Sequence, residues 1–300
     1  MRILVTGGAG FLGARLIQSL LDTQPLIDGQ RARAITSLDV GPCPISDERV
    51  ESVTGDISDP RVIESALGPD VAVVCHLAAV VSAEAEADFQ RGMQVNFDAT
   101  RVLLDACRRL AQAPRFLFAS SLAVFGPGEV EPLAEDTAPM PQSSYGTQKA
   151  IGELLVNDYS RRGFIDGRAC RLPTIVVRPG RPNKAASSFA SSIIREPLNG
   201  EDAICPVASD LPLWLSSPRT AVTNLVHALT LPADRLGDWR TFNLPGLTVT
   251  VSEMLDALER QAGIETRARV RFEPDAAIES IVNSWPGGLE TKRSLALGFV

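Results

Sequence analysis

Two residues four positions apart, Tyr145 and Lys149, have the chemistry to move a proton together. Both fall in a stretch with helical periodicity, so their side chains project from one helix face. A tyrosine has an unperturbed pKa of about 10, and an ammonium group beside it favours the phenolate form. Tyr145 is therefore a candidate general base, with Lys149 bringing the phenol toward use at neutral pH. Taken alone, this spacing is equally typical of an ordinary surface helix.

Ser120 and Ser121 follow a predicted strand at 115–119, and Ser121 precedes Tyr145 by 24 residues. Side chains at the carboxyl end of a parallel strand point into the ligand crevice. Ser121 can donate a hydrogen bond to a substrate oxygen whose charge changes, and so orient that oxygen against Tyr145. Serines at a strand end are otherwise turn formers, so this interpretation depends on the nearby Tyr and Lys.

A glycine-rich turn near the N-terminus predicts a nucleotide site. The apolar segment 3–5 runs into a G-x-x-G-x-x-G turn formed by Gly7, Gly10 and Gly13, and a helical stretch follows. Gly7 and Gly10 let backbone N–H groups approach a pyrophosphate, while Gly13 lets the helix pack on the strand and direct its dipole at the phosphates. The same turn also occurs without a ligand, but the strand and helix around it favour the nucleotide interpretation.

The second predicted strand, 34–39, ends in Asp39, a carboxylate 26 residues beyond Gly13. An acid at this place accepts hydrogen bonds from the adenosine ribose hydroxyls and repels a 2′-phosphate. The residues that follow, Val40-Gly41-Pro42, include no arginine to bind such a phosphate. NAD is therefore favoured over NADP. Asp56, after a third short strand, is expected to hold the adenine amino group, although an acid there is also common in turns.

Strand-length apolar runs alternate with helical stretches through the first half of the chain. This alternation predicts an α/β fold with a Rossmann-type doubly wound parallel sheet. The predicted strands are 3–5, 34–39, 71–76, 115–119 and 167–177, and the predicted helices are 10–22, 60–67, 89–112 and 145–162.

Beyond Pro179 the pattern loosens into Pro- and Ser-rich segments, which predicts a smaller, interleaved C-terminal substrate lobe. We assign 1–178 to an NAD-binding Rossmann domain and 179–300 to the substrate lobe, with about 219–245 returning to the first domain. The elements expected in this half are helices at 220–231 and 252–261, the latter capped by Ser252, and a strand at 241–244.

The 300 residues carry 29 basic and 36 acidic side chains, a formal net charge of −7. This balance argues against a protein that wraps nucleic acid or lies on an anionic membrane. The five scattered cysteines include no C-x-x-C pair, and His227 has no partner at ligand spacing, so no metal site is expected. No apolar run is long enough to span a bilayer and no signal peptide precedes the first strand, which predicts a cytoplasmic protein beginning at Met1.

Together these motifs resemble the extended short-chain dehydrogenase/reductases, also called the NAD-dependent epimerase/dehydratase family. The resemblance covers nearly the whole chain and includes the segment His76 to Ala79 and Asn96. It implies a catalytic triad of Ser121, Tyr145 and Lys149 and an NAD cofactor. The residues that the loop and the resemblance assign to the cofactor are Gly7, Gly10, Phe11, Leu12, Gly13, Asp39, Asp56, Ile57, Leu77, Ala78, Ala79, Asn96, Tyr145, Lys149 and Pro173.

The segment 171–191 is similar to a subgroup of that family that oxidises a four-carbon sugar acid, D-erythronate, at C2 to the 2-oxo acid. The likeness implies a small carboxylate as the substrate, with Pro173 against the nicotinamide. A homodimer is one possible oligomeric state. The residues expected to bind the sugar acid are Ser82, Ser121, Tyr145, Thr174, Lys184 and Arg219.

Two other functions use the same motifs. A sugar-nucleotide epimerase has the same triad but keeps its NAD and returns the hydride, and a non-catalytic protein could bind NAD as a sensor. A dehydratase is disfavoured because Leu122 and Ala123 stand where that chemistry needs a carboxylate pair.

Overall fold

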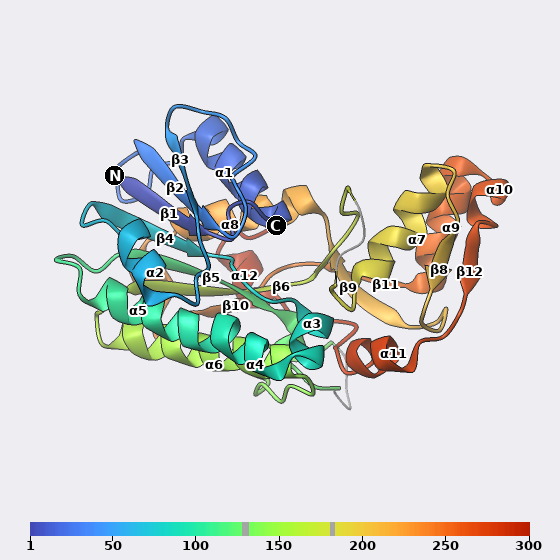
Figure 1. Cartoon of the computed structure of the whole chain (residues 1–300). Helices are drawn as coiled ribbons and strands as arrows, with labels where there is room; N and C mark the ends of the chain where they lie inside the picture. Colours follow the sequence, from blue (N-terminus) through green and yellow to red (C-terminus); the bar gives the residue numbers. More distant parts are fainter. Residues whose placement is uncertain (128–131, 181–183) are drawn as a thin grey trace.

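The structure is a computed structural model and describes residues 1–127, 132–180 and 184–300. A parallel seven-stranded sheet with helices on both faces forms its larger part (Figure 1). The strands lie in the order β10-β6-β5-β4-β1-β2-β3, which confirms the predicted Rossmann-type doubly wound sheet. Their bounds are β1 Arg2–Thr6, β2 Ala34–Asp39, β3 Val50–Thr54, β4 Val71–His76, β5 Arg115–Ser121, β6 Asp166–Leu172 and β10 Thr241–Asn243.

The strand order reverses between β1 and β4, the two strands at the centre of the sheet. Ile3, Leu4 and Val5 of β1 are fully buried, as expected of a strand covered by helices on both faces. At such a switch point the connections leave in opposite directions and open a crevice at the carboxyl ends of the strands. The glycine turn after β1 therefore faces the segment that begins at Leu77 after β4.

Two layers of helices sandwich this sheet (Figure 1). On one face Leu16 packs with Leu225, and on the other Leu103 packs with Val156. The first layer contains α1 (Phe11–Thr23) and α8 (Pro218–Thr230), and the second contains α2 (Pro60–Ala66), α5 (Ala99–Arg108) and α6 (Ser144–Arg161). Shorter helical segments beside the second layer are α3 (Ser82–Ala87), α4 (Phe89–Gly92) and the π-helical turn η1 (Met93–Asp98).

A smaller lobe has its own core around Phe189, Ile193 and Leu255. It holds a three-stranded sheet in the order β11-β9-β7 and a two-stranded sheet of β12 and β8. Its elements are β7 Thr174–Ile175, α7 Ser188–Leu198, β8 Ala203–Cys205, β9 Pro212–Ser216, β11 Leu247–Thr250, α9 Val251–Ala262, α10 Ile264–Arg267, β12 Val270–Phe272 and α11 Ala276–Val282. Between β9 and β11 the chain returns to the larger part as α8 and β10, and α12 (Lys292–Ala296) later packs beside β10. Two 3-10 turns are η2 (Leu122–Val124) and η3 (Ala233–Arg235).

The predicted strand 167–177 is wrong as a single element. β6 ends at Leu172, and β7 pairs with β9 in the small sheet. Pro173 lies between the two strands and has no N–H to donate to a ladder, so the chain leaves one sheet there and enters the other.

Two predicted helices also differ from the structure. The stretch 89–112 is broken into α4, η1 and α5, and it ends at Arg108. The helix expected from 252 is capped by Thr250 instead of Ser252. Thr250 accepts a hydrogen bond from the backbone N–H of Glu253, whose carboxylate accepts one from the backbone N–H of Thr250. This reciprocal pair is a capping box, which satisfies two N–H groups at the helix start.

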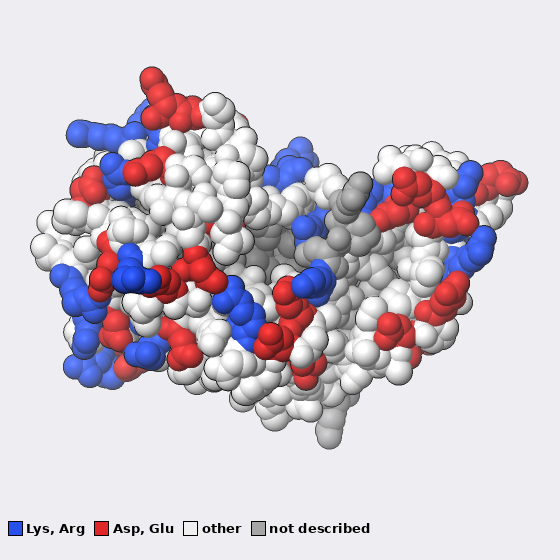
Figure 2. Space-filling model, in the orientation of Figure 1, with Lys and Arg blue, Asp and Glu red and all other residues white. Residues whose placement is uncertain are grey.

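Positive and negative side chains are mixed over the face of the molecule in Figure 2, which is hollowed between the larger part and the lobe. This face therefore offers no extended basic surface for nucleic acid. Within the described part of the chain, no helix combines the length and the apolar character needed to cross a membrane.

Candidate active site

Two adjoining cavities lie at the carboxyl edge of the large sheet, and Tyr145 lines both of them. The large cavity has a volume of about 540 Å³ and runs from Asp56 past the glycine turn to Lys149. The small cavity has a volume of about 160 Å³ and lies between Ser121 and the start of the lobe. The large volume falls in the range of about 300–1,000 Å³ typical of small-molecule and cofactor sites.

The glycine turn forms one wall of the large cavity and leaves no room for side chains. Gly7 has a φ of +74°, and a Cβ there would lie 2.6 Å from the backbone nitrogen of Ala78. A Cβ at Gly13 would lie 2.0 Å from the carbonyl oxygen of Gly7. The turn therefore brings bare backbone, and the unpaired N–H groups of the first turn of α1, against the cavity.

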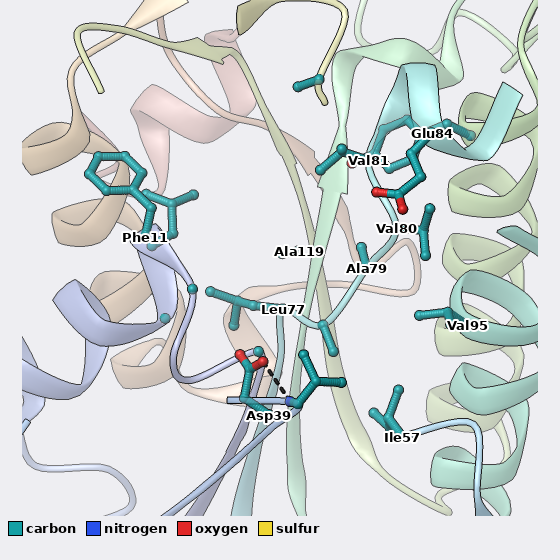
Figure 3. Close-up of a pocket in the computed structure, with 18 of the residues that line it drawn as sticks. Phe11, Asp39, Ile57, Leu77, Ala79, Val80, Val81, Glu84, Val95 and Ala119 are labelled. Atoms are coloured by element: carbon teal, nitrogen blue, oxygen red, sulfur yellow. Dashed lines mark hydrogen bonds between the residues drawn. The ribbon is translucent and has the colours of Figure 1, made fainter. Parts of the chain in front are cut away.

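Asp39 lies at the end of β2, on the floor of the large cavity (Figure 3). Its carboxylate accepts hydrogen bonds from the backbone nitrogens of Ala9 at 3.0 Å and Val40 at 2.7 Å. These two bonds hold an acceptor in a defined orientation beside the glycine turn, as the recognition of a ribose requires.

Asp56 lines the same cavity, together with Arg91, which the sequence analysis did not identify. The Asp56 carboxylate lies 2.8 Å from Nη2 of Arg91 and accepts two hydrogen bonds from Ser58. Partial burial raises the pKa of Asp56, but the bonds from Ser58 and Arg91 outweigh it and bring the pKa below its usual range. The carboxylate is therefore ionised and available to the end of a ligand remote from Tyr145.

The three predicted catalytic residues come together at the junction of the cavities. Ser143 caps α6 by accepting from the backbone nitrogen of Gly146 at 3.2 Å, which places Tyr145 in the first turn. A Cβ on Gly146 would lie 2.0 Å from the carbonyl oxygen of Ala123, so α6 begins in close contact with the segment after β5. This contact brings Tyr145 to Ser121.

Burial raises the pKa of Tyr145 to about 12, and a hydrogen bond with Ser121 opposes that rise. Burial likewise lowers the pKa of Lys149 to about 8, against the charge of Glu153. Nζ of Lys149 donates to the carbonyl oxygen of Ala119 at 2.9 Å and lies 5.7 Å from the centre of the Tyr145 ring. In the chain alone, burial thus outweighs the hydrogen bond from Ser121, and the phenol keeps its proton more strongly than the sequence analysis expected.

A buried ion pair, which the sequence analysis did not predict, lies next to this junction. Glu153 lies four residues after Lys149 and pairs with Arg171 at 2.7 Å, both side chains being almost fully buried. Its other oxygen accepts from Oγ of Ser120 at 2.5 Å and from Nε of Arg171 at 2.9 Å. The carboxylate is therefore held by hydrogen bonds, as a buried charge requires.

Asn96 is fully buried in η1 and does not line either cavity. Its amide bonds both backbone groups of Val80, at 2.8 and 2.9 Å, and donates to Gln148 at 2.7 Å. Asn96 thus fixes the chain that lines the large cavity.

His76 is also fully buried, between Thr6 and Thr100, and burial lowers its pKa to about 3.

The small cavity is lined by hydroxyl and apolar groups. Among the predicted substrate residues, Ser82, Ser121, Tyr145 and Thr174 line it, and so does Pro173, which was predicted to abut the cofactor. The other lining residues are Val81, Ser120, Leu122, Leu172, Ile175, Ala185, Ser187 and Trp285.

Neither Lys184 nor Arg219 lines the large or the small cavity. Lys184 is 74% exposed and pairs with Glu84, a residue of the large cavity, at 3.1 Å. Arg219 is exposed in the first turn of α8.

The remaining predicted cofactor residues line the large cavity: Gly7, Gly10, Phe11, Leu12, Gly13, Asp39, Asp56, Ile57, Leu77, Ala78, Ala79, Tyr145 and Lys149.

Arg178 also lines the large cavity, and the sequence analysis gave it no role in the site. Its guanidinium lies 5.1 Å from the centre of the Phe11 ring. A basic residue shortly after a strand whose carboxyl end faces a nucleotide turn is the signal that could have found it.

Known proteins resemble this chain over its full length. The model of the NAD dependent epimerase/dehydratase family matches residues 3–227. A D-erythronate dehydrogenase of Cupriavidus necator is 57% identical over 304 residues, covering 100% of this chain and 94% of that protein. A D-erythronate dehydrogenase of Haemophilus influenzae is 48% identical over 306 residues, with the same coverage of 100% and 94%.

A solved structure described as the nucleoside-diphosphate-sugar epimerase from Agrobacterium tumefaciens is 42% identical, with a TM-score of 0.92. The alignment covers 100% of this chain and 90% of the Agrobacterium tumefaciens chain. These likenesses confirm the resemblance drawn from the glycine turn and the Ser, Tyr and Lys motifs. The chain belongs to the NAD dependent epimerase/dehydratase family and uses a nicotinamide dinucleotide as its cofactor.

Proposed function

We propose that the chain is an NAD-dependent dehydrogenase that oxidises the C2 hydroxyl of D-erythronate to the 2-oxo acid. The observation that carries this proposal is the position of Tyr145 at the junction of the two cavities, with Ser121 and Lys149 beside it. A substrate in the small cavity then meets the base and the cofactor at one point. The D-erythronate dehydrogenases at 57% and 48% identity support the choice of substrate.

In the proposed reaction the hydroxyl proton passes to the oxygen of Tyr145 as the C2 hydroxyl becomes a carbonyl. Ser121 donates a hydrogen bond to the same substrate oxygen and keeps it in line with the phenol. A nicotinamide held in the large cavity would supply the acceptor for the hydride that leaves C2. Lys149 is anchored through Ala119 and directs its ammonium at the ring of Tyr145, where positive charge favours the phenolate.

Asp39 supports NAD as the form of the cofactor. Its carboxylate is oriented by Ala9 and Val40 at the place where the adenosine ribose lies in Rossmann folds. There it accepts from the 2′-hydroxyl of NAD and repels the 2′-phosphate of NADP.

The size and lining of the small cavity favour a small acid over a nucleotide sugar. One water takes about 30 Å³ of liquid volume, so the cavity of about 160 Å³ suits a short polyol. Hydroxyls of Ser82, Thr174 and Ser187 line it, and none of its described lining residues is a lysine or arginine. Neutral donors of this kind recognise both the hydroxyls and the carboxylate of a sugar acid.

A second candidate is a sugar-nucleotide epimerase, favoured by the structure of that description at 42% identity. Purified protein with NAD is assayed against D-erythronate and other four- to six-carbon sugar acids by NADH absorbance, and against UDP-sugars by product analysis. NADH formation with D-erythronate in preference to the longer acids is the expected result. Interconversion of UDP-sugars without accumulation of NADH contradicts the proposal and establishes the epimerase.

A further inference from the structure

Arg178 lies where the chain passes from the large sheet into the lobe, three residues after β7 ends at Ile175. Its backbone is fixed to α7 at two points. The backbone nitrogen donates to Oγ of Ser191 at 2.9 Å, and the carbonyl oxygen accepts from Nη1 of Arg195 at 2.7 Å. The side chain is thus projected from a well-anchored position.

The guanidinium of Arg178 reaches back to the nucleotide turn. It lies over the ring of Phe11, 5.1 Å from the ring centre, and Phe11 is the first residue of α1, directly after Gly10. Phe11 and Arg178 both line the large cavity, and Figure 3 shows Phe11 on the wall of that cavity. The arginine therefore lies beside the helix start whose N–H groups attract phosphate.

Arg178 differs from the other cationic residues of the large cavity in its partners. Of the described residues that line it, three are basic: Arg91, Lys149 and Arg178. Arg91 is paired with Asp56 at 2.8 Å, and Lys149 donates to the carbonyl of Ala119. Among the described residues, no acidic or carbonyl group accepts from the Arg178 guanidinium. Burial, and then the charge of Arg195, lower its pKa, as expected of a cation without an acid beside it.

We infer that Arg178 binds the pyrophosphate of the dinucleotide opposite the glycine turn. This inference rests on the proposed NAD-dependent function and adds a cationic group from the lobe side to a phosphate site that otherwise consists of backbone N–H groups. A guanidinium suits the task because its planar fork donates two parallel hydrogen bonds to phosphate oxygens. The ring of Phe11 keeps it at the required place through a cation–π contact.

Titration calorimetry tests this assignment. It measures the Kd of adenosine, ADP and NAD for the wild type and for Arg178→Met, by competition where a ligand binds weakly. Loss of a charge-assisted phosphate contact is expected to raise the Kd of ADP and NAD about tenfold or more. The Kd of adenosine, which has no phosphate, is expected to stay within about twofold. Arg178→Lys, which keeps the charge but not the fork, is expected to fall between wild type and Arg178→Met.

Arg15 provides a matched control because its guanidinium lies 5.0 Å from the centre of the same Phe11 ring but does not line the cavity. Arg15→Met is expected to bind all three ligands as the wild type does. Wild-type affinity for ADP in Arg178→Met, or an equal loss for adenosine, overturns the inference. Absence of NAD binding by the wild type would instead overturn the proposed function itself, so the two failures are distinguishable.

Discussion

The two cavities that meet at Tyr145 are built in different ways. The large cavity takes its wall from turns that directly follow strands of one parallel sheet, and its glycines and Asp39 are recognisable by local spacing. The small cavity collects single side chains from distant segments, from Ser82 to Trp285. In the proposed function, the cofactor is therefore bound by backbone geometry that the fold imposes, whereas the substrate meets side chains that only the tertiary arrangement brings together.

Tyr145, which lines both cavities, is expected to give the largest effect. Tyr145→Phe removes the base, so turnover is expected to fall about 10²- to 10⁴-fold while the Kd of NAD changes little. Steady-state kinetics with D-erythronate and calorimetry with NAD measure the two quantities. Tyr159→Phe is the matched control, because Tyr159 bonds Asp105 at 2.8 Å and lines neither cavity. Substantial activity in Tyr145→Phe would remove Tyr145 from its catalytic role.

A change confined to the large cavity is expected to alter cofactor choice and leave the substrate untouched. Asp39→Ser removes both the ribose acceptor and the charge that repels a 2′-phosphate, so the preference for NAD over NADP is expected to narrow about tenfold or more, or to reverse. The ratio of kcat/KM for the two cofactors measures it, with the KM of the sugar acid as the internal control. A wild type that reduces NADP as well as NAD contradicts the assignment of Asp39.

Lys149, at the junction of the cavities, is expected to lower the free energy of unfolding as well as to take part in the reaction. Burial depresses its pKa to about 8 from an ordinary value near 10.5, so the folded state resists protonation there. The wild type therefore loses stability as the pH falls from about 10.5 to about 8. The loss is on the order of 3 kcal/mol, because each pKa unit corresponds to about 1.4 kcal/mol.

Lys149→Met removes this titration, so its free energy of unfolding relative to the wild type is expected to be higher at pH 7 than at pH 10. Urea unfolding at the two pH values measures the difference. Lys292→Met, at an exposed lysine that pairs with Glu290, serves as the control and is expected to show no such change. Equal stability differences at both pH values would mean that the ammonium is not penalised by burial.

The smallest effects are expected outside both cavities. Lys184→Met removes an exposed ion pair with Glu84, and such pairs contribute about 0 to 1 kcal/mol. The KM for the sugar acid is therefore expected to change by less than about threefold, and Arg219→Met is expected to behave likewise. A tenfold rise in KM in either variant would restore the sequence-based assignment of these cations to the substrate carboxylate.

The contrast between the cavities also separates what was predictable from what was not. The glycine turn, Asp39 and the Tyr145/Lys149 pair follow rules of spacing, and the doubly wound parallel sheet follows from the alternation of strands and helices. Lys184 and Arg219 were chosen by charge and segment alone, and the structure places both at the surface. The Glu153–Arg171 pair and the contact of Arg178 with Phe11 join residues of separate elements, and the spacing of residues along the chain does not show which elements meet.

The departure of the chain into the lobe at Pro173 also affects how the protein is made. β6 gains its outer neighbour only when β10 arrives, with Ala169 paired to Thr241 and Arg171 to Asn243. At a synthesis rate of about 5–20 residues per second, roughly 3 to 14 seconds separate the two strands on the ribosome. During that interval β6 presents an open edge that can pair with another nascent chain. The interleaving that joins the lobe to the sheet thus leaves β6 without its outer neighbour until the last strand of the large sheet is complete.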